Sequence, residues 1–134
     1  MVLYENSIGS SFDAVDHAVT EILDLIRNQL PMIDPHTRFK INFMLREILN
    51  NAAEHGNHLD LNKKVAIKVN LVHEGLVFEV RDEGEGFKLD TDFHIKNNLR
   101  ERQRGYETLS EMAFKIVIEH NCVRVTFDLN MEVS

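Results

Sequence analysis

The sequence is short of several features that would place it in a familiar class of protein. It contains a single cysteine, Cys122, which excludes an internal disulfide and is typical of a reducing compartment. No apolar run approaches the roughly 18 residues of a membrane-spanning helix. Lys and Arg are outnumbered, 15 against 22 Asp and Glu, which gives a formal net charge of −7 at pH 7. Nucleic acids and anionic membranes are therefore not expected as partners, because binding their phosphates requires clustered basic side chains.

A targeting signal is also missing, because Glu5 interrupts the short apolar start at Val2 and Leu3. A cytoplasmic location is expected. What the sequence does contain is enough for a core, since 43% of its 134 residues are hydrophobic and 28% are charged. We find no internal repeat and no low-complexity tract, so the prediction is a single domain spanning residues 1–134.

Periodicity and turn residues divide this domain into helices and strands. Apolar residues at helical spacing, between two capping serines and a break at Pro31, predict a first helix. Asp34 and Pro35 are typical of the start of a second helix, which carries an apolar stripe and ends at Gly56. Helices packed on one face of a mixed, mainly antiparallel sheet make an α+β, two-layer sandwich. The other predicted elements are a short strand at 2–6, hairpins at 65–82 and 114–129, and a short helix at 104–112.

Polar residues on the second helix are suited to act on a metal ion and a nucleophile. Glu47 and Asn51 are spaced i, i+4 and are neighbours on the helix surface, and His55 extends the row by another turn. An amide oxygen is a hard ligand that holds Mg²⁺ together with phosphate oxygens and waters. A carboxylate one turn away can orient or deprotonate a water or a hydroxyl. Taken alone, the same residues also fit an ordinary solvated helix face. A transition-metal site at His55 and His58 is not expected, because Gly56 ends the helix between them.

A glycine-spaced acidic turn follows the first predicted hairpin and reads Asp82-Glu-Gly84-Glu-Gly86-Phe87. Asp82 continues the inward alternation of the preceding strand, so its side chain is expected to be buried at the end of the sheet. A buried carboxylate requires a donor, and the exocyclic amine of adenine is one. The glycines allow a ligand to approach the backbone closely. The alternative is a plain turn in which Asp82 caps local amides.

The loop after this turn reverses the charge of the protein locally. Arg104 and Gly105 open the predicted short helix, whose free N–H groups suit a phosphate. The stretch 84–103 has no convincing periodicity, and loops of that length are usually functional or mobile. Together these features predict an anionic ligand, although each charge alone also fits a solvated loop. The basic residues are Lys88, Lys96, Arg100, Arg102 and Arg104.

These motifs, in this order, resemble those of the GHKL ATPase superfamily, which unites gyrase, heat-shock chaperone, histidine-kinase and mismatch-repair ATPases. Residues 47–57 resemble its N-box, residues 82–87 resemble its G1 box, and Arg104-Gly105 stands where the G2 box is expected. The short length and the wording Asn-Ala-x-x-His-Gly-Asn are most similar to the bacterial anti-sigma-factor serine kinases. The resemblance implies the Bergerat-type, histidine-kinase-like ATPase fold.

The resemblance also implies two cofactors, ATP and Mg²⁺, and a role for each motif residue. Glu47 matches the catalytic base, and Asn51 matches the magnesium ligand. His55 lies within the motif and belongs to the predicted nucleotide-binding set. Asp82 matches the acid that recognises adenine, and residues 84–103 match the ATP lid. The remaining predicted nucleotide-binding residues are Gly84, Gly86, Phe87, Arg104 and Gly105.

The function implied by the resemblance is that of an ATP-dependent regulatory serine/threonine protein kinase. Its substrate would be an antagonist protein of the STAS type, with Glu47 activating the serine hydroxyl. Such a protein would also sequester a sigma factor or a similar regulator. A homodimer formed through the sheet side is expected from the family alone. Phosphoryl transfer depends mostly on positioning and charge neutralisation, so few catalytic groups are needed.

One position departs from the family pattern. Gln103 stands where relatives carry the first glycine of the G2 box, and a side chain there restricts the backbone near the phosphates. The alternative function is a non-catalytic protein-binding switch module with a degenerate nucleotide site. A fragment of a histidine-kinase-like ATPase is a weaker third interpretation, because no histidine-bearing dimerisation helix precedes the domain.

Overall fold

The computed structural model describes residues 1–73, 75–84, 107–112 and 114–129. In these ranges the strands are β1 (Val2–Gly9), β2 (Lys64–Val72), β3 (Gly75–Arg81), β4 (Lys115–Glu119) and β5 (Cys122–Asp128). The helices are α1 (Phe12–Gln29) and α2 (Pro35–Asn51), and a π-helical turn, η1 (Ala52–Gly56), continues α2. Residues 107–111 form a further short helix.

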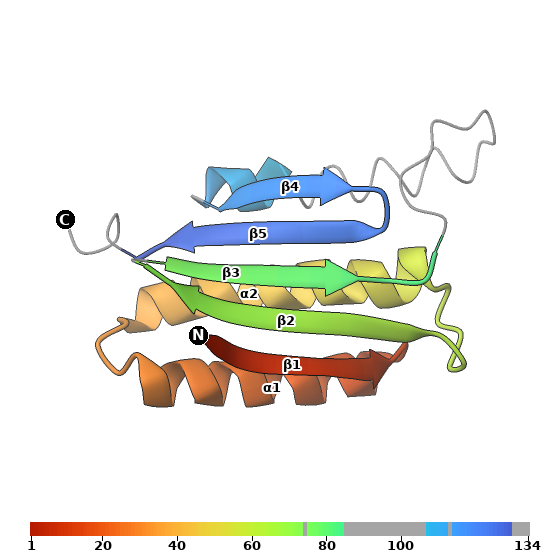
Figure 1. The fold of residues 1–134 in the computed structure, drawn as a ribbon, viewed down its shortest axis with the longest axis horizontal. Helices are drawn as coiled ribbons and strands as arrows, with labels where there is room; N and C mark the ends of the chain where they lie inside the picture. The colour runs from red at the N-terminus through yellow and green to blue at the C-terminus, as the bar shows by residue number, and fades with distance from the viewer. Residues whose placement is uncertain (74, 85–106, 113, 130–134) are drawn as a thin grey trace.

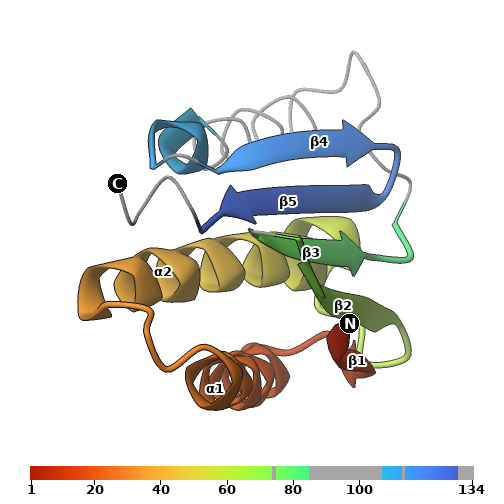
Figure 2. The same cartoon turned by 60° about the vertical axis from the view of Figure 1, so that its left-hand side comes forward.

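The five strands form one open sheet in the order β1-β2-β3-β5-β4. Each pair of neighbouring strands is antiparallel. Helices α1 and α2 pack against each other and lie on one face of this sheet (Figures 1 and 2). The predicted α+β, two-layer fold is therefore confirmed.

Side-chain caps start both long helices where the sequence predicts them. The Ser11 hydroxyl accepts a hydrogen bond from the Ala14 N–H at 3.1 Å, and the Asp34 carboxylate accepts one from the Thr37 N–H at 2.7 Å. Each bond satisfies one of the backbone donors that a helix leaves unpaired in its first turn. Pro35 fits this first turn because it has no N–H to leave unpaired.

One continuous apolar core lies between the helices and the sheet. The stripe predicted on the second helix is fully buried, and the inward residues of β2, β3 and β5 face it. Burial of this apolar surface is the main favourable term in folding, and it fixes the end of α2 against the end of β3. The helix contributes Ile41, Leu45, Ile48, Leu49 and Ala52, and the three strands contribute Val65, Ile67, Val69, Leu76, Phe78, Val80, Val123, Val125 and Phe127.

Local details differ from the sequence prediction. The first strand runs to Gly9, beyond the predicted 2–6. Its pairing with β2 continues to Gly9 and Lys64 through polar residues, which do not show the apolar alternation of a strand. The described strands contain no parallel pair, so the mixed character expected of the sheet is not found among them.

Within the described ranges, no helix is both long enough and apolar enough to cross a membrane.

Candidate functional site

Asp82 lies directly after β3, and its carboxylate points inward from the end of the sheet. Leu76, Phe78 and Val80 are buried on the same face of the strand, and Asp82 itself is only 5% exposed. The inward orientation predicted from strand alternation is confirmed. Asn121, in the turn between β4 and β5, fixes the backbone of Asp82 by two hydrogen bonds. The Asp82 N–H donates to the Asn121 carbonyl at 3.1 Å, and the Asn121 side-chain amide donates to the Asp82 carbonyl at 2.6 Å.

The turn after Asp82 folds back onto its carboxylate. The Gly84 N–H donates a hydrogen bond to Asp82 Oδ1 at 2.8 Å. This bond is the local cap that the plain-turn interpretation predicts, so Asp82 is both a buried acid and a cap. An ionised carboxylate has about four acceptor positions, so the cap is compatible with recognition of a further donor.

Two glycines bring the end of the helical segment into contact with this turn. A methyl group on Gly56 would lie 2.3 Å from Asp82 Oδ2, and one on Gly84 would lie 2.2 Å from the Gly56 carbonyl oxygen. Real side chains do not approach other atoms this closely, so both positions require glycine. The two motifs that the sequence separates by a hairpin therefore meet, with Asp82 between them.

On α2, Glu47 and Asn51 form the pair that the i, i+4 spacing predicts. The Asn51 Nδ2 lies 3.4 Å from Glu47 Oε1, which is long for a hydrogen bond. Asn51 is 8% exposed, and within the described part of the chain its Oδ1 accepts no hydrogen bond. A buried acceptor without a protein donor is rare in a folded protein, and such an oxygen is available to a water, a ligand or an ion.

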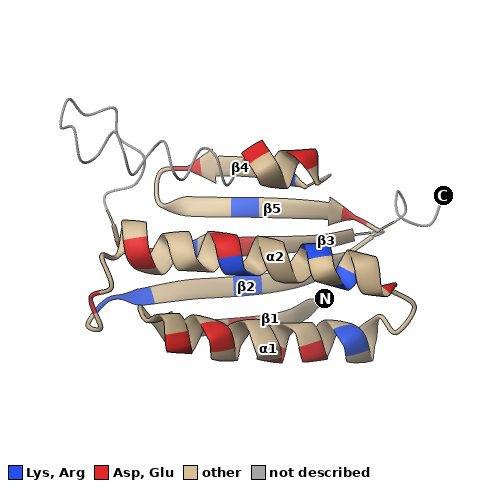
Figure 3. Ribbon diagram, turned by 180° about the vertical axis from the view of Figure 1, so that it is seen from behind, with Lys and Arg blue, Asp and Glu red and all other residues tan. Residues whose placement is uncertain are grey.

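The Glu47 carboxylate is half-buried and is not held by the arginine next to it in the sequence. Arg46 instead pairs with Asp16 of α1 at 2.9 Å and donates to Asn42 at 3.0 Å. Figure 3 shows the acidic residues spread along α1 and the mixture of acidic and basic residues on α2. Among the described residues, Glu47 therefore has no cationic partner that would block it as a base.

The π-helical turn η1 follows Asn51 directly and ends at Gly56, which lies against Asp82. His55 lies in η1 and is half-buried, while Ala52 and Ala53 are buried beneath it. Single π-helical turns often occur at functional sites, because the wider turn redirects the residues that follow it. Here η1 places Gly56 against the Asp82 carboxylate.

These residues fit a magnesium-bound adenine nucleotide. The buried Asp82 carboxylate is an acceptor suited to the amine of adenine. The Asn51 Oδ1, which accepts no hydrogen bond from the described residues, is a hard oxygen suited to Mg²⁺. The described residues contain no group of three or more His, Cys, Asp or Glu side chains that could hold a metal ion. A magnesium ion at Asn51 would thus take most of its ligands from phosphate oxygens and water.

Several predicted site residues lie outside the described ranges. Gly86, Phe87, Arg104 and Gly105 are among them, as are all of the predicted lid at 84–103 except Gly84. Their roles stay predictions. The short helix at 107–111 agrees with the later part of the helix predicted at 104–112.

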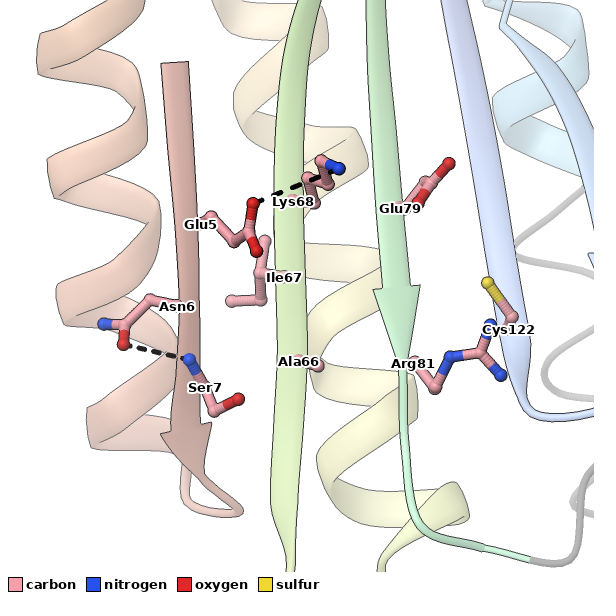
Figure 4. A pocket seen from close by; sticks show the side chains of 9 residues that line it. All are labelled: Glu5, Asn6, Ser7, Ala66, Ile67, Lys68, Glu79, Arg81 and Cys122. Carbon is pink, nitrogen blue, oxygen red and sulfur yellow. Dashed lines mark hydrogen bonds and ion pairs between the residues drawn. The ribbon is translucent and has the colours of Figure 1, made fainter. Parts of the chain in front are cut away.

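A separate hollow of about 410 Å³ lies on the opposite face of the sheet, over the small side chain of Ala66 (Figure 4). Its lining carries two acidic residues, Glu5 and Glu79, and two basic residues, Lys68 and Arg81. Lys68 lies 4.0 Å from Glu5, and Arg81 donates a hydrogen bond to Asn121 at 3.2 Å. The hollow therefore lacks the excess of positive charge that favours phosphate. The candidate nucleotide site is confined to the face that carries α2.

One buried residue that supports the turn after Asp82 was not among the site residues predicted from the sequence. Asn57 has no exposed surface, and its side chain bonds to Ser10, to the Lys64 carbonyl and to the Glu83 N–H. It lies at the end of the N-box-like segment, so the motif did include it. No pattern of spacing signals that it is buried among three backbone segments.

Fold and site together define a two-layer α+β domain with a candidate nucleotide site at the end of its second helix. Residues 12–127, from α1 to β5, match the family of histidine kinase-like ATPase domains, and the chain belongs to that family. Membership supports binding of ATP, typically with Mg²⁺. A comparison with curated proteins finds no match.

Proposed function

We propose that this chain binds Mg-ATP and acts as a regulatory serine/threonine protein kinase that resembles an anti-sigma factor. The observation that carries the proposal is the buried Asn51 oxygen, which lies one helical turn from Glu47 and accepts no hydrogen bond from any described residue. The Asn51 oxygen is suited to hold Mg²⁺ on the phosphates, and the Glu47 carboxylate is suited to act as a base beside the phosphates. Contact of the same helical segment with Asp82, through Gly56, supports a single site for base and phosphates.

Each residue has a distinct part in this proposal. Bound ATP supplies the phosphoryl group that is transferred. Asp82 accepts a hydrogen bond from the adenine amine and fixes the base. Asn51 would hold Mg²⁺ by its carboxamide oxygen. Glu47 would take the proton from the partner's serine hydroxyl as that oxygen bonds to the γ-phosphorus and ADP leaves.

The proposed partner is an antagonist protein of the STAS type, which is phosphorylated, and the chain would also sequester a sigma factor or a similar regulator in the cytoplasm. A homodimer formed through the sheet side is part of the same proposal. These assignments rest on the motif wording Asn-Ala-x-x-His-Gly-Asn.

The test is phosphoryl transfer from ATP labelled on its γ-phosphate, with Mg²⁺ and a purified STAS-type antagonist. Glu47→Gln preserves the size of the side chain and removes the base, so transfer should fall by about 10²- to 10⁴-fold. ADP affinity, measured by calorimetry, should change little. Glu54→Gln is the matched control, because Glu54 is exposed on the same helical segment and should leave transfer unchanged.

A result with ATP binding but no transfer to any antagonist would contradict the kinase and leave a binding role. A separate second candidate, a protein-binding switch with a degenerate nucleotide site, is motivated by Gln103 in place of a glycine. It predicts little or no heat on titration with ATP and Mg²⁺. The kinase predicts clear heat that is lost in Asp82→Ala.

A further inference from the structure

Asn57 joins three segments of the chain that are distant in the sequence. Its Nδ2 donates to Ser10 Oγ at 2.9 Å and to the Lys64 carbonyl at 3.0 Å. Its Oδ1 accepts from the Glu83 N–H at 2.7 Å. The side chain is completely buried, so every one of these bonds replaces one that water would otherwise make.

The third bond acts on the turn that carries Asp82. Glu83 follows Asp82 directly, and its N–H is fixed by Asn57. The Lys64 N–H donates to the Glu83 carboxylate, so the same turn is also tied to the start of β2. Together with the Gly84 cap on Asp82, these bonds leave the Asp82 carboxylate little freedom to rotate.

The π-helical turn explains why Asn57 can reach this position. The Asn57 N–H bonds to the Ala52 carbonyl at 2.9 Å, five residues back, and the Leu59 N–H bonds to the Ala53 carbonyl at 2.8 Å. A five-residue bond widens the helix by one residue relative to the ordinary four-residue bond. The extra residue turns Asn57 toward the core, while Asn51 and Glu47 keep the face set by α2.

We propose that Asn57 is a positioning residue for base recognition. Its carboxamide oxygen holds the Glu83 N–H and so sets the direction in which the neighbouring Asp82 carboxylate meets the base. The inference rests on the proposed function in assigning adenine to Asp82. The bond from Nδ2 to Ser10 stabilises the fold without contacting the turn, whereas the bond to the Lys64 carbonyl holds the start of β2, which also contacts Glu83.

Three variants separate these roles. Asn57→Ala removes all three bonds. Ser10→Ala removes the bond to Ser10 and the bond from its hydroxyl to the Lys63 carbonyl, and it leaves the Glu83 bond intact. Asn57→Asp keeps an acceptor for the Glu83 N–H but places a second oxygen against the Lys64 carbonyl, so it should lose stability while retaining the bond to the turn.

The functional readout is the ratio of affinities for ADP and inosine diphosphate, measured by calorimetry on the whole chain. Hypoxanthine has a carbonyl where adenine has its amine, so the native chain should prefer ADP by about tenfold to hundredfold. Asn57→Ala should bring this ratio close to one. Ser10→Ala should lower the melting temperature and keep the ratio, and Asn57→Asp should recover most of it.

Hydrogen exchange of the Glu83 and Gly84 amides supplies a readout without nucleotide. Both amides should be protected in the native chain and in Ser10→Ala, and both should exchange faster in Asn57→Ala. A native base ratio that persists in folded Asn57→Ala, with unchanged exchange, would overturn the inference. A native chain that binds both nucleotides equally would instead refute the adenine role of Asp82, and the exchange data would still decide whether Asn57 fixes the turn.

Discussion

At the scale of single residues, Gly56 and Gly84 determine how closely the two motifs approach. A methyl group at either position would overlap an atom that cannot move away easily, the carboxylate of Asp82 or the carbonyl of Gly56. Gly56→Ala and Gly84→Ala should therefore each destabilise the chain by about 1–3 kcal/mol, as overpacking does elsewhere. Both should also weaken ADP binding sharply, because the turn must move to relieve the overlap.

The matched control for this prediction is Gly9→Ala. A methyl group at Gly9 would meet no atom within 4 Å, so that variant should keep native stability and affinity. Thermal unfolding and ADP titration of the three variants measure both quantities. Native affinity in Gly84→Ala would show that the observed contact between the motifs is not needed for binding.

The individual site residues differ in how well the sequence predicts them. Asp82 was predictable because strand alternation extends from Val80 to the residue two positions later. Asn57 was not predictable, because its hydrogen bonds are to three chain segments that only the fold brings together. Ser10 and Ser11 were both predicted as helix caps; Ser11 is the cap, and Ser10 is buried against Asn57. Neighbouring serines are equivalent in sequence, and only tertiary packing distinguishes them.

At the scale of elements, the start of α2 depends on an ionised cap. The backbone N–H and the hydroxyl of Thr37 donate to the Asp34 carboxylate and hold its pKa below the ordinary value of 3.8. A lowered pKa means that the folded state favours the charged form. The cap therefore contributes its full stability above the ordinary pKa and loses it as the pH falls through the lowered value.

Asp34→Asn tests this dependence, because Asn is an equally good cap without charge. The native chain should melt at a higher temperature than Asp34→Asn at neutral pH, and the gap should close as the pH is lowered below the ordinary carboxyl pKa. Asp34→Ala should melt lower than both at neutral pH. A gap between native and Asp34→Asn that is constant with pH would contradict an ionised cap.

Most elements could be predicted because their signals are local. The caps, the Pro31 break and the alternation of β3 and β5 each lie within a few residues, so propensity and pattern agree with the fold. The π-helical turn could not be predicted, since a five-residue bond leaves the apolar spacing of residues 52–56 almost unchanged. The end of β1 could not either, because pairing with β2 extends it through polar residues.

At the scale of the whole molecule, one core connects both helices and the sheet. Residues of α1, α2, β2, β3 and β5 belong to the same buried cluster, and Leu109 of the short helix joins it. A domain with a single core is expected to unfold in one cooperative transition. A ligand bound at one end of the sheet should therefore stabilise all of it.

Magnesium should add to this stabilisation only through Asn51. ADP at 100 times its dissociation constant should stabilise the native chain by about 2.7 kcal/mol, and Mg²⁺ should raise the melting temperature further by tightening binding. In Asn51→Ala the rise with ADP alone should persist, because Asp82 is intact, while the increment from Mg²⁺ should vanish. Chelation with EDTA should reduce native Mg-ADP stability to the same level.

The matched control is Asn50→Ala, next to Asn51 on α2. It should keep the increment from Mg²⁺, since Asn50 makes no side-chain hydrogen bond within the described ranges and is assigned no role. An increment that survives in Asn51→Ala would place the metal elsewhere and remove the basis for pairing Asn51 with Glu47.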